Sequence, residues 1–254
     1  MGIEKPEFKF EPNVNATIRD TRTSGLYADV PKGGEIRVRF APKSGSLWTK
    51  AVNHYGFKRE DDKGGTIACL NFHGTEATGA KCFICALVDY LSTADTKVER
   101  KLSQGLGSLA STENYYAQVW VYEDDGEGGA IYTGPKLLRL PKTGAERVGE
   151  VLDRLVNVQS QPHFADPENG QDLIIRNAGK GLPAQRYSAM ETAKIYPLAE
   201  IDSMWQEKLI ADVYARLALR IYSPLEQYQI AREKYADEIN WDRVAEEVEV
   251  PNGE

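Results

Sequence analysis

The chain has 254 residues and a formal net charge of −7, with 41% hydrophobic and 27% charged residues. These values are ordinary for a globular protein of one large or two small domains. No apolar run is long enough to span a membrane, the N-terminal segment lacks a signal-peptide pattern, and free cysteines suit a reducing compartment, so we expect a cytoplasmic protein.

The first half of the chain is predicted to be mostly extended. Residues 1–30 mix charges with prolines, and we expect a loosely ordered arm there. Residues 35–40 alternate strictly between polar and apolar side chains, which predicts a half-buried strand, and 47–52 reads as a second strand. Residues 66–72 are predicted to form another strand, and a short helix is predicted to begin near Cys82.

All three cysteines and two of the three histidines lie between residues 54 and 85. Cys69 is followed by the pair Cys82 and Cys85, and His54 and His73 are the nearby histidines. Three thiolates and one imidazole form a usual closed, tetrahedral set for a structural zinc ion. We therefore expect one structural Zn²⁺, with either histidine as the fourth ligand.

A catalytic zinc is less well supported by the motifs. Zinc deaminases combine a His-x-Glu motif with Pro-Cys-x-x-Cys. Here Glu76 lies one place too far from His73, and Lys81 takes the place of the proline before Cys82. The chain also has no phosphate-binding Gly-x-x-x-x-Gly-Lys motif, so an ATPase is not expected. A nuclease that binds metal through carboxylates remains open.

Residues 115–122 predict the clearest strand, because they are aromatic and β-branched. Tyr116, Gln118, Trp120 and Tyr122 share one face. An aromatic face of this kind suits stacking on nucleic-acid bases, but it also suits a barrel core, and composition alone favours the core.

The remaining chain alternates turns and short elements. Residues 136–140, 172–177 and 186–190 are predicted strands, and 143–156 is a predicted helix. Many short strands separated by turn signals indicate a β barrel.

The C-terminal part is predicted to be helical, with one helix from about residue 202 to 222 and a second over 223–235. A short helix is possible over 241–248, inside the acidic segment 236–254. Lysines and arginines exceed acidic residues between 31 and 120. A mildly basic centre with an acidic end is compatible with a groove that binds phosphates, although a solvated surface gives the same counts.

The order of these motifs resembles the T-even-type bacteriophage single-stranded-DNA-binding (helix-destabilising) protein family. The resemblance rests on Val52-Asn53-His54-Tyr55-Gly56-Phe57-Lys58, Cys69-x-x-x-His73-Gly74 and Cys82-x-x-Cys85, and on segments 36–40, 115–119 and 223–235. It covers roughly residues 32–236. It implies a non-enzymatic protein that binds single-stranded DNA largely without sequence preference. Such a protein acts in phage DNA replication, recombination and repair, in the cytoplasm of the infected bacterial host.

The resemblance also implies a mainly β fold with helices. Its core is an OB-fold-derived five-stranded barrel over 31–197, with a zinc subdomain inserted at about 52–92. C-terminal helices over 198–235 are expected to pack on this core, and 236–254 is expected to form a short acidic tail that contacts replication and recombination proteins.

For the site, the resemblance implies His54 as the fourth zinc ligand. It places five residues in the DNA groove: Arg39, Tyr115, Tyr116, Arg139 and Tyr187. Proximity and charge add Lys50, Arg100, Lys101, Lys142 and Arg186 as further candidate DNA contacts.

The arm and the tail depart from the family. Residues 1–30 contain no basic run, which puts cooperative assembly on DNA in doubt, so we expect a monomer in the absence of DNA. Two other hypotheses stay open. One is a zinc-stabilised protein-interaction module with a core of aromatic residues, and the other is a metal-dependent nuclease.

Overall fold

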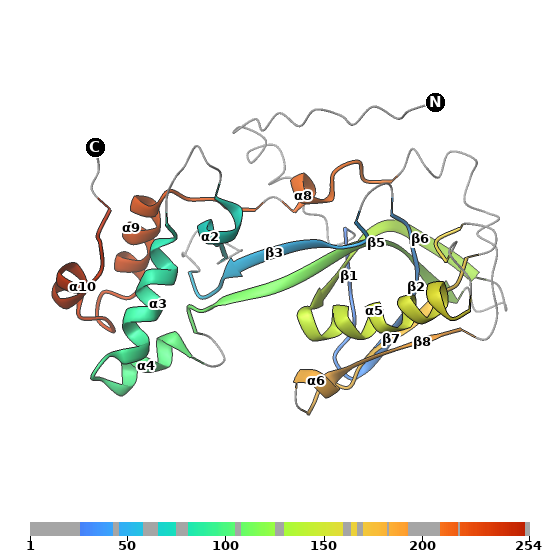
Figure 1. Cartoon of the computed structure of the whole chain (residues 1–254), viewed down its shortest axis with the longest axis horizontal. Coiled ribbons are helices and arrows are strands. Elements are labelled where there is room, and N and C mark those ends of the chain that lie inside the picture. The colour runs from blue at the N-terminus through green and yellow to red at the C-terminus, as the bar shows by residue number, and fades with distance from the viewer. Residues whose placement is uncertain are drawn as a thin grey trace.

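The computed structural model describes residues 26–42, 46–57, 66–74, 81–104, 108–124, 130–159, 164–166, 170–181, 183–192, 209–217 and 219–251. These residues form two lobes joined by a pair of long strands (Figure 1). Among them, no helix is long and apolar enough to cross a membrane.

One mixed sheet forms the larger lobe and reaches into the smaller one. Its strands are β1 (Tyr27–Asp29), β2 (Gly34–Phe40), β3 (Thr49–His54), β4 (Ile67–Ala68), β5 (Ser111–Asp124), β6 (Ala130–Pro141), β7 (Leu173–Asn177) and β8 (Tyr187–Glu191). The order is β1-β6-β5-β2-β7-β8, with β3 paired to both β4 and β5. All pairs are antiparallel except the parallel pair of β1 with β6.

Strand β5 links the two lobes. One of its edges pairs with β6, and the other pairs with β3 over Ser111–Tyr116 and then with β2 over Val119–Tyr122. We call β3 and the β5 segment that pairs with it the bridge. The register of β5 on β6 shifts between Val119 and Val121, and such a bulge bends a strand.

Helix α5 (Lys142–Asn157) covers one face of the sheet. Its apolar stripe, predicted from the spacing of Val148, Val151, Leu152 and Leu155, is buried. These side chains pack with Val38, Phe40, Val119, Leu138 and Ile175, among others, to form the core of the larger lobe.

The smaller lobe, which we call the cysteine lobe, is mainly helical. It contains β4 and the helices α2 (Leu70–His73), α3 (Phe83–Thr93), α4 (Lys97–Ser103), α9 (Pro224–Lys234) and α10 (Trp241–Glu247). A single apolar cluster joins the C-terminal helices to α3, and Phe83 and Tyr228 pack edge to face in it. Two further short helices are α6 (Pro183–Arg186) and α8 (Val213–Arg216).

Three expectations from the sequence differ from the structure. The predicted strand 66–72 turns into α2 after Ala68, because the carbonyl of Cys69 accepts the N–H of His73. Of the predicted helix over 202–222, residues 202–208 and 218 lie outside the described residues, and the rest is helical only in α8. Residues 219–223 are not helical, and the carbonyl of Arg220 accepts the N–H of Ala68. Helix α4 was not predicted, although Thr96 caps it by accepting the N–H of Glu99 at 3.2 Å.

The segment expected to be an acidic tail is folded over most of its length. Ile239, Val244 and Val248 are buried in the core of the cysteine lobe, and the indole N–H of Trp241 donates to the Tyr235 carbonyl at 3.0 Å. Apolar side chains spaced along an acidic sequence bury one face and leave the charges exposed. The C-terminal helices α9 and α10 therefore pack on α3 within the cysteine lobe. The barrel closure expected for the core remains a prediction, since β1 and β8 are the two ends of the strand order.

Candidate metal centre and the surface beside it

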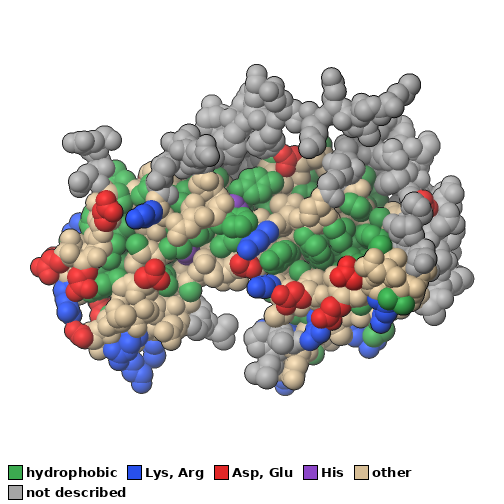
Figure 2. Space-filling view, in the orientation of Figure 1, with side chains coloured by type: hydrophobic (Ala, Val, Ile, Leu, Met, Phe, Trp, Pro, Cys, Tyr) green, Lys and Arg blue, Asp and Glu red, His purple; other side chains and the backbone are tan. Residues whose placement is uncertain are grey.

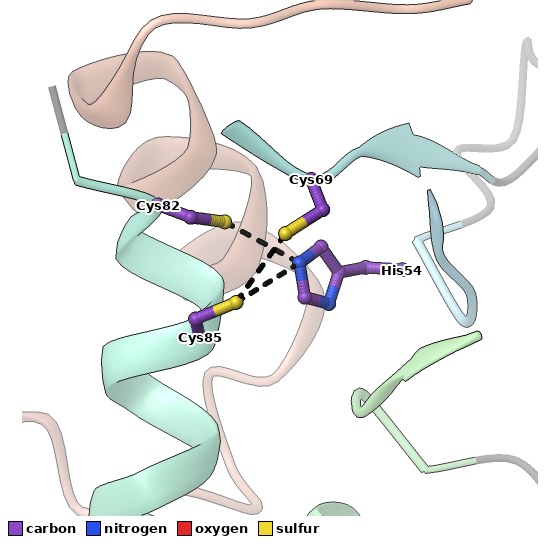
Figure 3. A group of neighbouring side chains, drawn as sticks. All are labelled: His54, Cys69, Cys82 and Cys85. Carbon is purple, nitrogen blue, oxygen red and sulfur yellow. Dashed lines mark hydrogen bonds between the residues drawn. The ribbon is translucent and has the colours of Figure 1, made fainter. Parts of the chain in front are cut away.

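Four side chains from three segments converge in the cysteine lobe (Figure 3). His54 is the last residue of β3, and Cys69 follows β4 directly. Cys82 is the N-cap of α3, and Cys85 lies in its first turn. Their candidate ligand atoms lie within 4.8 Å of one another, so the cluster could hold one metal ion.

The separations fit a tetrahedral ion. Sγ of Cys82 is 3.3 Å and Sγ of Cys85 is 3.6 Å from Nε2 of His54, and Sγ of Cys69 is 3.5 Å from that of Cys85. Tetrahedral zinc with ordinary bond lengths holds two sulfurs about 3.8 Å apart and a sulfur and a nitrogen about 3.6 Å apart. The geometry is therefore compatible with a structural zinc ion.

Hydrogen bonds that involve backbone groups hold two of these residues in place. Nδ1 of His54 donates to the Leu109 carbonyl at 2.8 Å, which leaves Nε2 facing the sulfurs. The backbone N–H of Cys82 donates to Oδ1 of Asn71 at 2.9 Å. A ligating histidine usually has such a partner on its second nitrogen, because that partner fixes the tautomer and the ring orientation.

The electrostatics of the cluster favour a thiolate on Cys82. Hydrogen bonds from Cys69 and Cys85 hold the pKa of the Cys82 thiol well below its usual value. Burial lowers the pKa of His54, but hydrogen bonds with Cys69 and Cys82 outweigh that effect and raise it to about 9. Hydrogen bonds with Cys69 and Cys82 raise the pKa of Cys85. The group therefore stabilises a thiolate on Cys82, which is the form that binds metal.

The structure separates the two candidate histidines. His54 lies with the cysteines, as the resemblance implied. The ring of His73 is also buried, but it contacts the backbone of Val52 and the hydroxyl of Tyr214.

The exposed face of the bridge collects several predicted DNA contacts. Lys50 lies directly opposite Tyr115 on the neighbouring strand. Nζ of Lys50 forms an ion pair with Glu113 at 2.6 Å, and the hydroxyl of Tyr115 donates to the same carboxylate at 3.3 Å. Lys142 lies close enough to Glu113 to lower the pKa of its carboxyl, after the larger effect of Lys50.

Two aromatic residues that were not singled out as contacts extend this face. Phe72 of α2 is 45% exposed, and its ring centroid is 4.9 Å from Nζ of Lys50. Trp48 packs edge to face against Tyr115, with ring centroids 6.5 Å apart. We call Trp48, Lys50, Phe72 and Tyr115 the bridge surface. Trp48 and Phe72 lie in the predicted strands 47–52 and 66–72, but their place in a strand pattern does not by itself show that they reach the surface.

Two predicted contacts, Arg186 and Tyr187, lie near α5. Tyr115 pairs with Leu140 on β6, and a Cβ on Gly144 would meet both Leu140 and the ring of half-buried Tyr187. Arg186 precedes Tyr187 and donates to the Gly181 carbonyl at 3.3 Å. Figure 2 shows hydrophobic side chains gathered at the centre of this view and a hollow in the outline between the lobes.

Three predicted contacts lie on the opposite face of the sheet. Tyr116 is only 7% exposed and packs with Tyr27 and Leu217. Arg139 is exposed and pairs with Asp29 at 3.0 Å.

Arg39 is fully buried, with Nε 2.6 Å from the Asp172 carboxylate. Because the guanidinium of Arg39 is buried and paired with the carboxylate of Asp172, a phosphate in solvent cannot contact it in this structure.

The last two predicted contacts lie on the cysteine lobe. Arg100 and Lys101 are exposed in the last turn of α4. Arg100 donates from Nη1 to the carbonyls of Ala94 and Asp95 at 2.5 and 2.8 Å. The guanidinium of Arg100 has further N–H donors that could bind a phosphate, and Lys101 presents an ammonium group.

Comparison with known proteins assigns no family. No protein-family model matches the sequence, and no curated protein matches it either. The function is therefore inferred from the chemistry of the metal cluster and of the surface beside it.

Proposed function

We propose that this protein binds single-stranded DNA on the bridge surface and holds one structural zinc ion through His54, Cys69, Cys82 and Cys85. The observation that carries the proposal is a group of aromatic rings around Lys50, of which Trp48 and Tyr115 are partly buried and Phe72 is 45% exposed. These residues lie on and beside the strand pair that joins the two lobes.

Aromatic rings and cations together suit single-stranded DNA. Each base has a π-face, so stacking on a side chain tolerates any sequence and contributes about 1–3 kcal/mol per base. Cations along the backbone release counterions from the phosphates, which adds affinity that falls with salt. Trp48, Phe72 and Tyr115 supply the rings, while Lys50 and Lys142 supply the charges.

Glu113 does not exclude this role for Lys50. The ion pair is about one-third exposed on each side, and exposed ion pairs contribute little stability. A phosphate can therefore replace the carboxylate as the partner of Lys50 at low cost.

The metal would act as a structural element. Three thiolates and one imidazole fill the four positions of tetrahedral zinc, so the ion would supply folding free energy to the cysteine lobe. That lobe holds α2, which presents Phe72, and it anchors one end of the bridge. We infer that zinc holds Phe72 in position beside the rings of Trp48 and Tyr115.

The proposal includes an OB-fold-derived core, and the bulge that bends β5 supports it. It also includes action in phage DNA replication, recombination and repair, in the cytoplasm of an infected host. Within the described residues, the Cys/His cluster is the only group with metal-ligand spacing, so no carboxylate cluster there favours the nuclease hypothesis.

The test is a titration of the zinc-loaded protein with oligo(dT), followed by tyrosine and tryptophan fluorescence at several salt concentrations. Saturable quenching that weakens steeply with salt is the expected result. Absence of binding at low salt would overturn the proposal. Magnesium-dependent cleavage of the oligonucleotide would instead indicate the nuclease.

A further inference from the structure

A glutamine from the C-terminal region lies against the metal cluster. Gln227 belongs to α9 and is fully buried. Its Oε1 lies 3.4 Å from Sγ of Cys82 and 3.4 Å from the backbone nitrogen of Ile84, in the first turn of α3. Its Nε2 donates to the Tyr222 carbonyl at 3.3 Å.

The placement of this amide needs a reason beyond packing. A buried amide costs free energy unless its donors and acceptors have partners. The neighbours of Gln227 on the apolar side of α9, Ile230 and Ala231, are ordinary core residues. Among the side chains of α9, Gln227 extends a polar group to Sγ of Cys82, and α9 follows Cys82 by more than a hundred residues.

We propose that Gln227 is a positioning residue for the metal centre, which holds the Cys82 thiolate through a hydrogen bond. In this structure the amide oxygen of Gln227 faces Sγ of Cys82 at 3.4 Å. A metal-bound thiolate has no proton to give, so the amide turns over and Nε2 donates to Sγ. The two ends of an amide have nearly the same shape, which allows this exchange.

The exchange takes the amide away as partner of the Tyr222 carbonyl and of the Ile84 N–H, and these two hydrogen bonds are long, at 3.3 and 3.4 Å. In return the amide gains a hydrogen bond to an anion, which is roughly twice as strong as a neutral one. The proposal links metal retention to the docking of α9, because Gln227 reaches the sulfur only when α9 is packed on α3. It rests on the proposed zinc binding and not on DNA binding.

The experiment measures zinc release from the full chain into an excess of a chromogenic chelator. Gln227→Leu keeps the volume and removes the hydrogen bond, and Gln229→Leu makes the same change on the exposed side of the same helix. Loss of an outer hydrogen bond to a ligand typically weakens metal binding 10–100-fold. Faster release of about that size from Gln227→Leu, with Gln229→Leu like the wild type, is the expected result.

Release at the wild-type rate from Gln227→Leu would overturn the inference and leave the zinc site standing. Wild-type protein that binds no zinc would overturn both. If Gln227→Leu does not fold, the wild-type protein loaded with cadmium still provides a test. A scalar coupling between the metal and a side-chain amide proton of Gln227 in NMR spectra is expected, and its absence would refute the hydrogen bond.

Discussion

The imidazole of His73 accepts a hydrogen bond from the backbone N–H of Val52, with Nε2 3.0 Å from the nitrogen. Its other nitrogen, Nδ1, lies 2.6 Å from the hydroxyl of Tyr214. Because the lone pair of Nε2 accepts the N–H of Val52, the ring proton is on Nδ1, which donates to the hydroxyl of Tyr214. Both ring nitrogens are occupied, although His73 is the histidine nearest to Cys69 in sequence.

We predict that His73→Ala keeps its zinc but loses stability. The change leaves a buried backbone N–H without its partner, which costs about 1–3 kcal/mol. His54→Ala should instead lose the metal. Zinc content and the free energy of unfolding in denaturant check both variants. Loss of zinc from His73→Ala with retention in His54→Ala would reverse the assignment of the fourth ligand.

Removal of zinc should destabilise the protein. A ligand present at about 1,000 times its Kd stabilises the folded state by about 4 kcal/mol. For a chain of this size that corresponds to a fall in Tm of about 8–16 °C. Thermal unfolding with and without a strong chelator measures it, with Cys85→Ser as a variant that should already match the chelated protein. Equal Tm values in all three samples would rule out a structural site.

Phe72→Ala should weaken DNA binding without much loss of stability. The ring is 45% exposed, so its loss leaves no cavity, whereas a lost base stack costs about 1–3 kcal/mol, or about 5- to 150-fold in Kd. Met190→Ala removes another exposed apolar side chain far along the sheet and serves as the control. Fluorescence titration with oligo(dT) gives both affinities. Equal weakening by the two variants would argue against stacking on Phe72.

Lys50→Gln should reduce the salt dependence of binding. Each phosphate contact contributes about 0.7 to the slope of log K against log salt for single strands. The slope should fall by about that amount, while Glu113→Gln, which frees Lys50 from its partner, should leave the slope unchanged and tighten binding. Titrations at several salt concentrations test this. An unchanged slope in Lys50→Gln would place the phosphates elsewhere.

Ionisation of the buried Tyr116 phenol should lower the free energy of unfolding at alkaline pH. Burial raises the pKa of this phenol to about 12, from about 10 in an unfolded chain. The neutral form is favoured in the folded state, so this contribution is complete below pH 10 and is lost as pH rises toward 12, by about 2–3 kcal/mol. Denaturant unfolding between pH 9 and 12 compares Tyr116→Phe with the wild type. The same decline in both proteins would show that Tyr116 is not the cause.

The sequence by itself determined several of the local elements and the three cysteines of the candidate metal site. Period-2 alternation over 35–40 and a helical stripe over 143–156 specify β2 and α5, because each pattern buries only one face. Cysteine is scarce and its sulfur binds metal, so the spacing of Cys69, Cys82 and Cys85 alone indicated a shared site.

Only the tertiary structure decided which side chains face solvent. Tyr115 and Tyr116 are neighbours in sequence, yet they lie on opposite faces of β5, where Tyr115 is partly exposed and Tyr116 is buried. The same packing removed Arg39 from the surface and brought Phe72 over Lys50. Sequence spacing sets the alternation of a strand, but what covers each face depends on segments far away in the chain. For that reason the packing of α8 against Tyr116 and the contact of Gln227 with Cys82 could not be predicted from the sequence.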